Sequence, residues 1–100
     1  MAVSMDSKLK NKLRKIFNKH DPIGIYFGRN MNFDEYDPEI KQLPSIFYKA
    51  RSRGKFQEEF YELFVRMFFR NIVGNKVKYK KLAKEVYDLL KVDKDESNRD

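Results

Sequence analysis

The chain has no cysteine and only one histidine among its 100 residues. The lack of cysteine excludes a disulfide framework, a thiolate zinc site and a cysteine nucleophile, and it agrees with an expected cytoplasmic location. Because no run of about 18 apolar residues is present, we expect no membrane-spanning segment. The N-terminus has early lysines without an apolar stretch behind them, which is unlike a signal peptide.

Aromatic and charged side chains are both abundant. Nine Phe and six Tyr supply large apolar groups, and hydrophobic residues make up 41% of the chain against 37% charged residues. This apolar content is enough to offset the chain entropy lost on folding, and the length is that of one domain. We therefore expect a single folded domain with its own core.

The net charge of +7 is unevenly distributed along the chain. Residues 1–20 carry +5 and residues 75–91 carry +4, whereas residues 21–43 carry −3. A basic protein raises the question of a polyanionic partner such as nucleic acid. The pattern indicates basic outer segments with an acidic stretch between them.

Helical periodicity dominates outside the acidic stretch. Apolar residues at i, i+4, i+7 and i+8 predict a first helix that begins at Ser4 or Asp6 and ends near Lys19. The pair Asp21-Pro22 should end it, because a residue before proline avoids the α region. These apolar residues are Leu9, Leu13, Ile16 and Phe17.

A second helix should begin with Asp37 as N-cap and Pro38 in the first turn. Pro44 interrupts its apolar pattern, so we expect a kink or two short helices there. The segment 55–72 is apolar on most sides, which is typical of a central, buried helix. A last helix over 77–90 should follow a stop at Gly74-Asn75.

These patterns predict an all-α fold, a compact bundle of about four helices with an ordered loop between the first and second. The loop, residues 21–36, is too apolar for a free linker, and we expect Ile23, Ile25, Phe27 and Phe33 to anchor it on the core. Residues 1–91 form the expected domain, and residues 92–100 the expected disordered polar tail.

The loop and the following helix start carry the acidic cluster of the folded part. Helix capping and solvation explain such residues in most proteins. As metal ligands they would suit calcium or magnesium, but their spacing does not match an EF-hand loop. The remaining interpretation is a patch that contacts another protein, formed by Asp34, Glu35, Tyr36, Asp37 and Glu39.

His20 is the only histidine. A general base needs a partner and a cleft, and the sequence names neither. A protonated histidine at the C-terminal end of a helix is favoured by the helix dipole, which explains His20 without a catalytic role. No nucleophile, cofactor or metal motif is present, so we expect no enzymatic activity.

Lysine-rich helix faces are the basis of an alternative function, nucleic-acid binding. Lysine suits phosphate contacts, whereas base readout relies more on Arg, Asn and Gln. No helix-turn-helix, zinc-finger, RRM or KH signature accompanies these faces. The residues that would bind are Lys8, Lys12, Lys80, Lys81 and Lys84.

Asp21-Pro22-Ile23-Gly24, followed by Asp34-Glu35-Tyr36-Asp37-x-Glu39-Ile40, resembles a small bacterial helical family. Its members carry a Trp-Asp-Pro-Ile/Leu-Gly turn and then an Asp-Glu-Tyr-Asp/Glu element that opens the next helix; His20 stands where the family often has Trp. Similar domains occur among immunity proteins encoded beside bacterial toxins. The resemblance implies a helical, non-enzymatic protein-binding module without a cofactor, whose partner would be a toxin domain.

Overall fold

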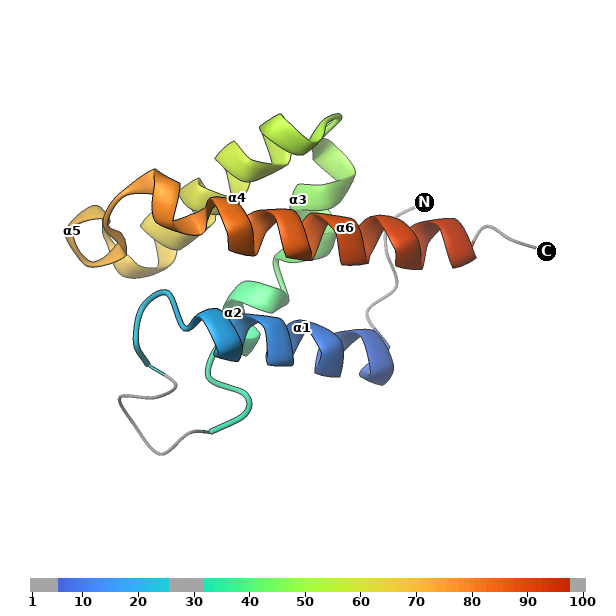
Figure 1. The fold of residues 1–100 in the computed structure, drawn as a ribbon, viewed down its shortest axis with the longest axis horizontal. Coiled ribbons are helices and arrows are strands. Elements are labelled where there is room, and N and C mark those ends of the chain that lie inside the picture. Colours follow the sequence, from blue (N-terminus) through green and yellow to red (C-terminus); the bar gives the residue numbers. More distant parts are fainter. Residues whose placement is uncertain (1–5, 26–31, 98–100) are drawn as a thin grey trace.

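The computed structural model describes residues 6–25 and 32–97, and all regular structure in these ranges is helical (Figure 1). The all-α prediction is therefore confirmed. In chain order the helices are α1 (Ser7–His20), α2 (Asp37–Ile40), α3 (Leu43–Lys49), α4 (Arg53–Phe68), α5 (Arg70–Val73), the 3-10 helix η1 (Lys76–Tyr79) and α6 (Lys80–Ser97).

The ends of α1 are set by two aspartates. The Asp6 carboxylate accepts a 2.8 Å hydrogen bond from the Leu9 N–H, which is a normal N-cap. Asp21 adopts a left-handed conformation with φ of 43°, and its N–H donates to the Phe17 carbonyl. Both boundaries agree with the sequence pattern to within about a residue.

The second predicted helix is two short helices, α2 and α3, with Pro44 in the first turn of α3. The expected interruption is confirmed. The expected cap is wrong, because the N-cap position of α2 is Tyr36, without a side-chain hydrogen bond, and Asp37 lies inside the helix. The Asp37 carboxylate binds an arginine of α1 instead, as described below.

Helix α4 supplies the centre of the core. Phe56, Phe60 and Phe64 are fully buried on it, and their rings pack in sequence at tilted angles with centroids 5.8 and 5.3 Å apart. The predicted extent to residue 72 is wrong, because the helix ends at Phe68 and the backbone turns at Phe69 before α5. Residues 69–72, which the prediction placed in the central helix, are at the surface rather than in the core.

The last helix begins later and ends later than predicted. Residues 76–79 form η1, and α6 continues to Ser97. Residues 92–97, expected in the disordered tail, are therefore helical, while residues 98–100 lie outside the described part of the chain. Residues 92–97 contain three acids and one lysine with Val92 as the single apolar residue, so no apolar stripe predicts a helix in this extension.

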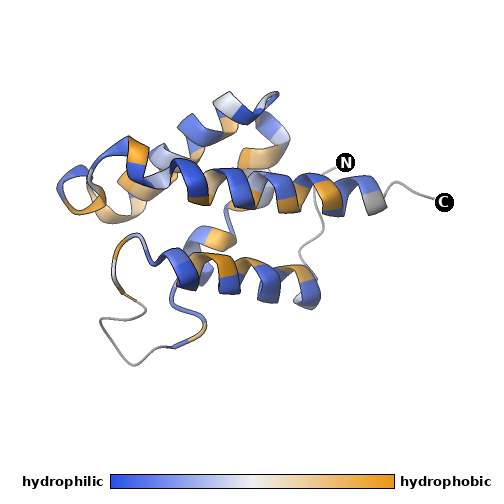
Figure 2. Ribbon diagram, viewed as in Figure 1, coloured by the Kyte–Doolittle hydropathy of each residue, from blue (hydrophilic) through white to orange (hydrophobic). Residues whose placement is uncertain are grey.

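Helices α1 and α6 lie side by side in opposite directions, and α4 packs against α6 (Figure 1). The apolar stripes of these helices face inward, as the orange positions in Figure 2 show. Among the described helices, none combines the length and apolar character that crossing a membrane requires.

The loop after α1 is packed at its first end. Ile23 and Ile25 are partly buried against the core, as predicted. Phe33 is 41% exposed, contrary to its expected role as an anchor, and the Arg14 guanidinium lies 5.4 Å from its ring centroid. Phe27, the fourth expected anchor, lies outside the described residues.

Candidate binding surfaces

Tyr36, expected at the centre of an acidic contact patch, is in the core. Its side chain is only 1% exposed and its ring packs against Phe17 and Phe64. The hydroxyl donates a 2.7 Å hydrogen bond to Asp21 and accepts one from the Ile23 N–H. Burial and the bond to Asp21 raise the pKa of Tyr36, so its hydroxyl stays a donor. Tyr36 is therefore a structural residue and is not available to a partner.

Asp37 is held by α1. Its carboxylate accepts two hydrogen bonds from Arg14, 2.9 Å from Nε and 2.6 Å from Nη2, and Lys10 Nζ lies 3.6 Å away. The hydrogen bond from Arg14 is the main reason that the pKa of Asp37 is lowered. A bidentate pair of this kind fixes the orientation of α2 on α1.

Glu39 is buried at 2% exposure, and its Oε1 has no hydrogen-bond partner. Burial raises its pKa to about 7. A buried carboxylate with an unpaired oxygen is costly when charged, so ionised Glu39 destabilises the fold near neutral pH. It cannot contact another protein from this position.

The remaining acids of the expected patch are Asp34, which is exposed, and Glu35, which is half-buried and accepts a hydrogen bond from Asn32. The structure therefore does not bring the five predicted residues onto one accessible surface. No group of three or more potential metal-ligating His, Asp or Glu side chains occurs among the described residues.

His20 contacts the Glu85 carboxylate through Nε2, and Lys19 Nζ lies 2.7 Å from the other oxygen of Glu85. The hydrogen bond from Lys19 is the main reason that the pKa of Glu85 is lowered. These contacts join the end of α1 to α6. They give the histidine a structural role between two helices.

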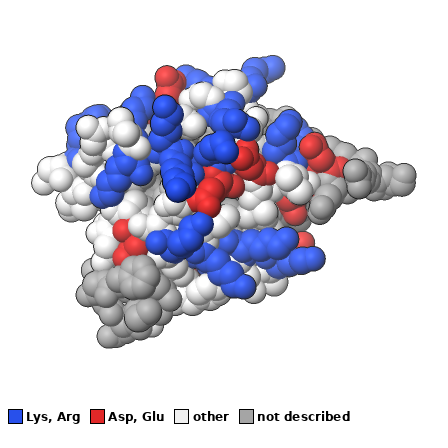
Figure 3. Space-filling view, viewed as in Figure 1, with Lys and Arg blue, Asp and Glu red and all other residues white. Residues whose placement is uncertain are grey.

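The five lysines of the alternative, nucleic-acid site are all exposed but lie in two separate places. Because α1 and α6 run in opposite directions, Lys8 and Lys12 lie beside the second half of α6. Lys80, Lys81 and Lys84 lie near the start of α6, and Lys84 precedes Leu89, the first α6 residue of that neighbourhood, by about 7.5 Å along the helix axis. Figure 3 shows carboxylates between the lysines in the seam of this face.

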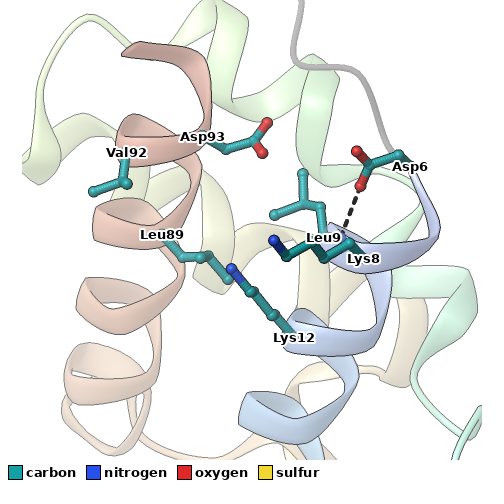
Figure 4. Close-up of a pocket in the computed structure, with 7 residues that line it drawn as sticks. All are labelled: Asp6, Lys8, Leu9, Lys12, Leu89, Val92 and Asp93. Carbon is teal, nitrogen blue, oxygen red and sulfur yellow. Dashed lines mark hydrogen bonds between the residues drawn. The ribbon is translucent and has the colours of Figure 1, made fainter. Parts of the chain in front are cut away.

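A cavity of about 310 Å³ lies between α1 and α6 (Figure 4). Two lysines and two aspartates share it, so its charges balance, and the Asp6 carboxylate is already engaged as a helix cap. This composition does not favour a ligand of either charge. The lining residues are Asp6, Lys8, Leu9, Lys12, Leu89, Val92 and Asp93.

A different set of exposed side chains lies on the end of α4, on α5 and on η1, which precede the start of α6. Four large apolar side chains are exposed between residues 67 and 77, and we call this set the apolar corner. Its members are Met67, Phe69, Ile72 and Val77. Phe69 is the most unusual of them, because 72% of an aromatic side chain is in solvent.

Phe69 also has an unusual backbone. Its φ of 69° and ψ of 147° lie in a region that is essentially reserved for glycine. Such a conformation costs about 1–3 kcal/mol and persists only where the surroundings impose it. Neither burial nor backbone preference explains a phenylalanine here.

The inner side of the apolar corner is rigidly held. Val73 is fully buried, and Tyr79 and Tyr61 donate 2.7 Å hydrogen bonds to the carbonyls of Val73 and Gly74. Burial raises the pKa of Tyr79 to about 12, so this donor persists at physiological pH. The corner is therefore a preformed surface on a fixed support.

The segment of the chain that contains this corner is strongly basic. Residues 63–84 contain seven Lys and Arg and no Asp or Glu. Of the 22 basic residues, the 15 outside this segment equal the 15 acidic residues of the chain. The basic residues of the segment are Arg66, Arg70, Lys76, Lys78, Lys80, Lys81 and Lys84.

Sequence patterns did not reveal the apolar corner, because its residues continue the apolar pattern of α4 and look like core. The lack of acidic residues over 63–84 is the one sequence signal that could have indicated this surface. Comparison of the chain with models of known protein families, with curated proteins and with solved structures finds no match.

Proposed function

We propose that this protein is a non-enzymatic protein-binding module that contacts its partner through the apolar corner. The observation that carries the proposal is Phe69, an aromatic side chain held in solvent by a strained backbone on a rigid support. Exposed apolar groups that cluster on a surface mark interaction sites, and aromatic residues are frequent anchors.

This surface replaces the acidic patch that the sequence predicted. Tyr36 and Glu39 are inside the protein, and Asp37 is bound to Arg14. The biological setting that the resemblance of residues 21–40 supports is neutralisation of a bacterial toxin by a cytoplasmic immunity protein. The structural role of Asp21 and Tyr36 means that this motif supports the fold, while the contact surface lies elsewhere.

Photo-crosslinking in the native host tests the proposal. Benzoylphenylalanine at position 69 should crosslink a specific protein, whereas the same group at position 48 should not. Tyr48 is a matched control, because it is an aromatic residue of α3 that is 66% exposed. The captured protein is then purified and its affinity for the wild type and for two alanine variants is measured.

Phe69→Ala should weaken this complex by about 30-fold or more, the effect of losing an anchor worth about 2 kcal/mol. Tyr48→Ala should leave the affinity unchanged. Equal crosslinking at both positions, or an affinity that does not respond to Phe69→Ala, would show that the apolar corner is not the binding surface.

Nucleic-acid binding is the second candidate, and the observation that favours it is the acid-free basic segment 63–84. Phosphate contacts would make affinity for arbitrary DNA or RNA fall steeply with salt. A gel-shift series at two salt concentrations separates the two functions. Tight, salt-sensitive binding of nucleic acid that persists in Phe69→Ala would favour this second function.

A further inference from the structure

The basic residues beside the apolar corner are available to a partner. Within the described part of the chain, only Lys84 of the seven forms an ion pair, with Asp88 at 3.7 Å. Several acids elsewhere are paired internally, as in the pairs of Arg14 with Asp37 and Lys19 with Glu85. The corner therefore combines exposed apolar groups with cations that no internal carboxylate neutralises.

A cavity of about 220 Å³ adjoins the corner at Val77. Lys76 and Lys80 line it together with the Gln57 side chain and the Tyr79 ring, and no acidic residue does. This differs from the cavity between α1 and α6, where two aspartates accompany two lysines. The lining of the cavity at Val77 therefore includes two basic residues and no acidic one among the described residues, which favours an anionic group such as a carboxylate over a cation.

From this arrangement we infer the chemistry of the partner, in a step that rests on the proposed function. We propose that the apolar corner binds an acidic amphipathic helix of another protein. The apolar face of that helix covers Phe69, Ile72 and Val77, and one of its carboxylates enters the cavity between Lys76 and Lys80. Complementary charge then sets the specificity and the rate of association.

Two other anionic partners fit the surface less well. A nucleic acid offers phosphates to the cations, and the bases of a single strand can stack on Phe69, but the aliphatic side chains of Ile72 and Val77 would stay in water. Binding flat on a lipid surface usually needs a long amphipathic helix, and α5 has four residues. An acidic amphipathic helix can cover the apolar groups with one face and pair its carboxylates with the cations.

Defined probes test this inference. We choose a synthetic helical peptide of about 18 residues with leucines on one face and glutamates on the other, and a second peptide with glutamine in place of glutamate. A single-stranded DNA of similar length and phosphatidylglycerol vesicles are the rival probes. Affinities are measured at low salt and at about 0.3 M salt.

The glutamate peptide should bind the wild type about tenfold more tightly than the glutamine peptide, a difference that about 1.4 kcal/mol of charge complementarity supplies. Lys76→Glu with Lys80→Glu should abolish this preference. Lys8→Glu with Lys12→Glu is the matched control, since it makes the same change in net charge at the other cavity, and it should leave most of the preference intact.

If both peptides bind equally and Phe69→Ala weakens both, the inference that the partner is acidic is wrong while the proposed function stands. The inference also fails if the glutamate peptide does not bind, if the two double variants behave alike, or if DNA or vesicles bind more tightly. The proposed function is judged separately by the crosslinking at position 69.

Discussion

The hydroxyl of Tyr36 donates a 2.7 Å hydrogen bond to Oδ1 of Asp21 and accepts a 3.1 Å bond from the Ile23 N–H. One phenol thereby joins the Asp-Pro-Ile-Gly turn after α1 to the Asp-Glu-Tyr-Asp element before α2. The two halves of the sequence motif are thus in direct contact across the loop. This contact explains why the motif contains a tyrosine rather than a phenylalanine.

Tyr36→Phe should therefore destabilise the fold by about 1–3 kcal/mol, because the ring is kept but both hydrogen bonds of the part-buried hydroxyl are lost. Urea denaturation measures the change in the free energy of unfolding. Tyr48→Phe is the control and should have no effect, since Tyr48 is exposed. Equal stability of the two variants would show that the hydrogen bond contributes nothing net.

Phe64→Ala tests the assignment of α4 as the centre of the core. Phe64 is fully buried, and its ring lies 5.1 Å from that of Tyr79 and 6.1 Å from that of Phe17, measured between centroids. The substitution should cost about 3–5 kcal/mol, the usual range for a buried phenylalanine. An unchanged melting temperature would contradict the described packing.

Local patterns predicted most of the helices because apolar periodicity and proline act over short distances. Leu9, Leu13 and Phe17 lie on the buried stripe of α1, and Pro44 separates two short helices as expected. The predicted end of α4 was wrong because further apolar residues follow Phe68 and the next glycine or proline is Gly74. The turn at Phe69 has no local sequence signal.

The candidate site was less predictable for the same reason. Asp37 matches the pattern of an N-cap, but Arg14, distant in the sequence, binds its carboxylate. Tyr36 and Phe69 are both aromatic residues in apolar surroundings, yet one is buried and the other exposed. Only the folded arrangement distinguishes a core aromatic residue from a surface anchor.

Glu39 should make stability depend on pH. Burial raises its pKa from an ordinary value of 4.5 to about 7, so the folded state binds this proton more tightly than the unfolded state. The resulting stabilisation is fully present below about pH 4.5 and is lost as the pH rises through about 7. Relative to the wild type, Glu39→Gln should gain roughly 2–3 kcal/mol at pH 8 and little at pH 4.

Thermal denaturation of both proteins at several pH values gives this difference directly. Titrating groups that do not interact with Glu39 cancel in the comparison. The charge of Asp37 adds to the raised pKa of Glu39, but the pKa of Asp37 itself is lowered, so Asp37 stays ionised over most of this pH range. A gain that is the same at every pH would contradict a titrating Glu39 and would indicate a packing effect of the amide instead.

Phe69→Gly should change stability and binding in opposite directions. Glycine adopts the φ of 69° without strain, which recovers about 1–3 kcal/mol, and it adds about 0.5–1 kcal/mol of chain entropy to the unfolded state. Little burial is lost because the side chain is mostly exposed. The net gain should be about 1 kcal/mol or more, seen as a higher urea midpoint.

Phe69→Ala separates the two causes, because alanine removes the ring but keeps the backbone strain. We expect Phe69→Ala to be no more stable than the wild type and Phe69→Gly to be the most stable of the three. Both variants should bind the partner about 30-fold or more weakly. Such a pattern means that the chain carries a costly conformation at this position to hold an aromatic ring in solvent. A Phe69→Gly protein that is less stable than Phe69→Ala would show that the backbone there is not strained, and the argument for an anchor would lose its structural basis.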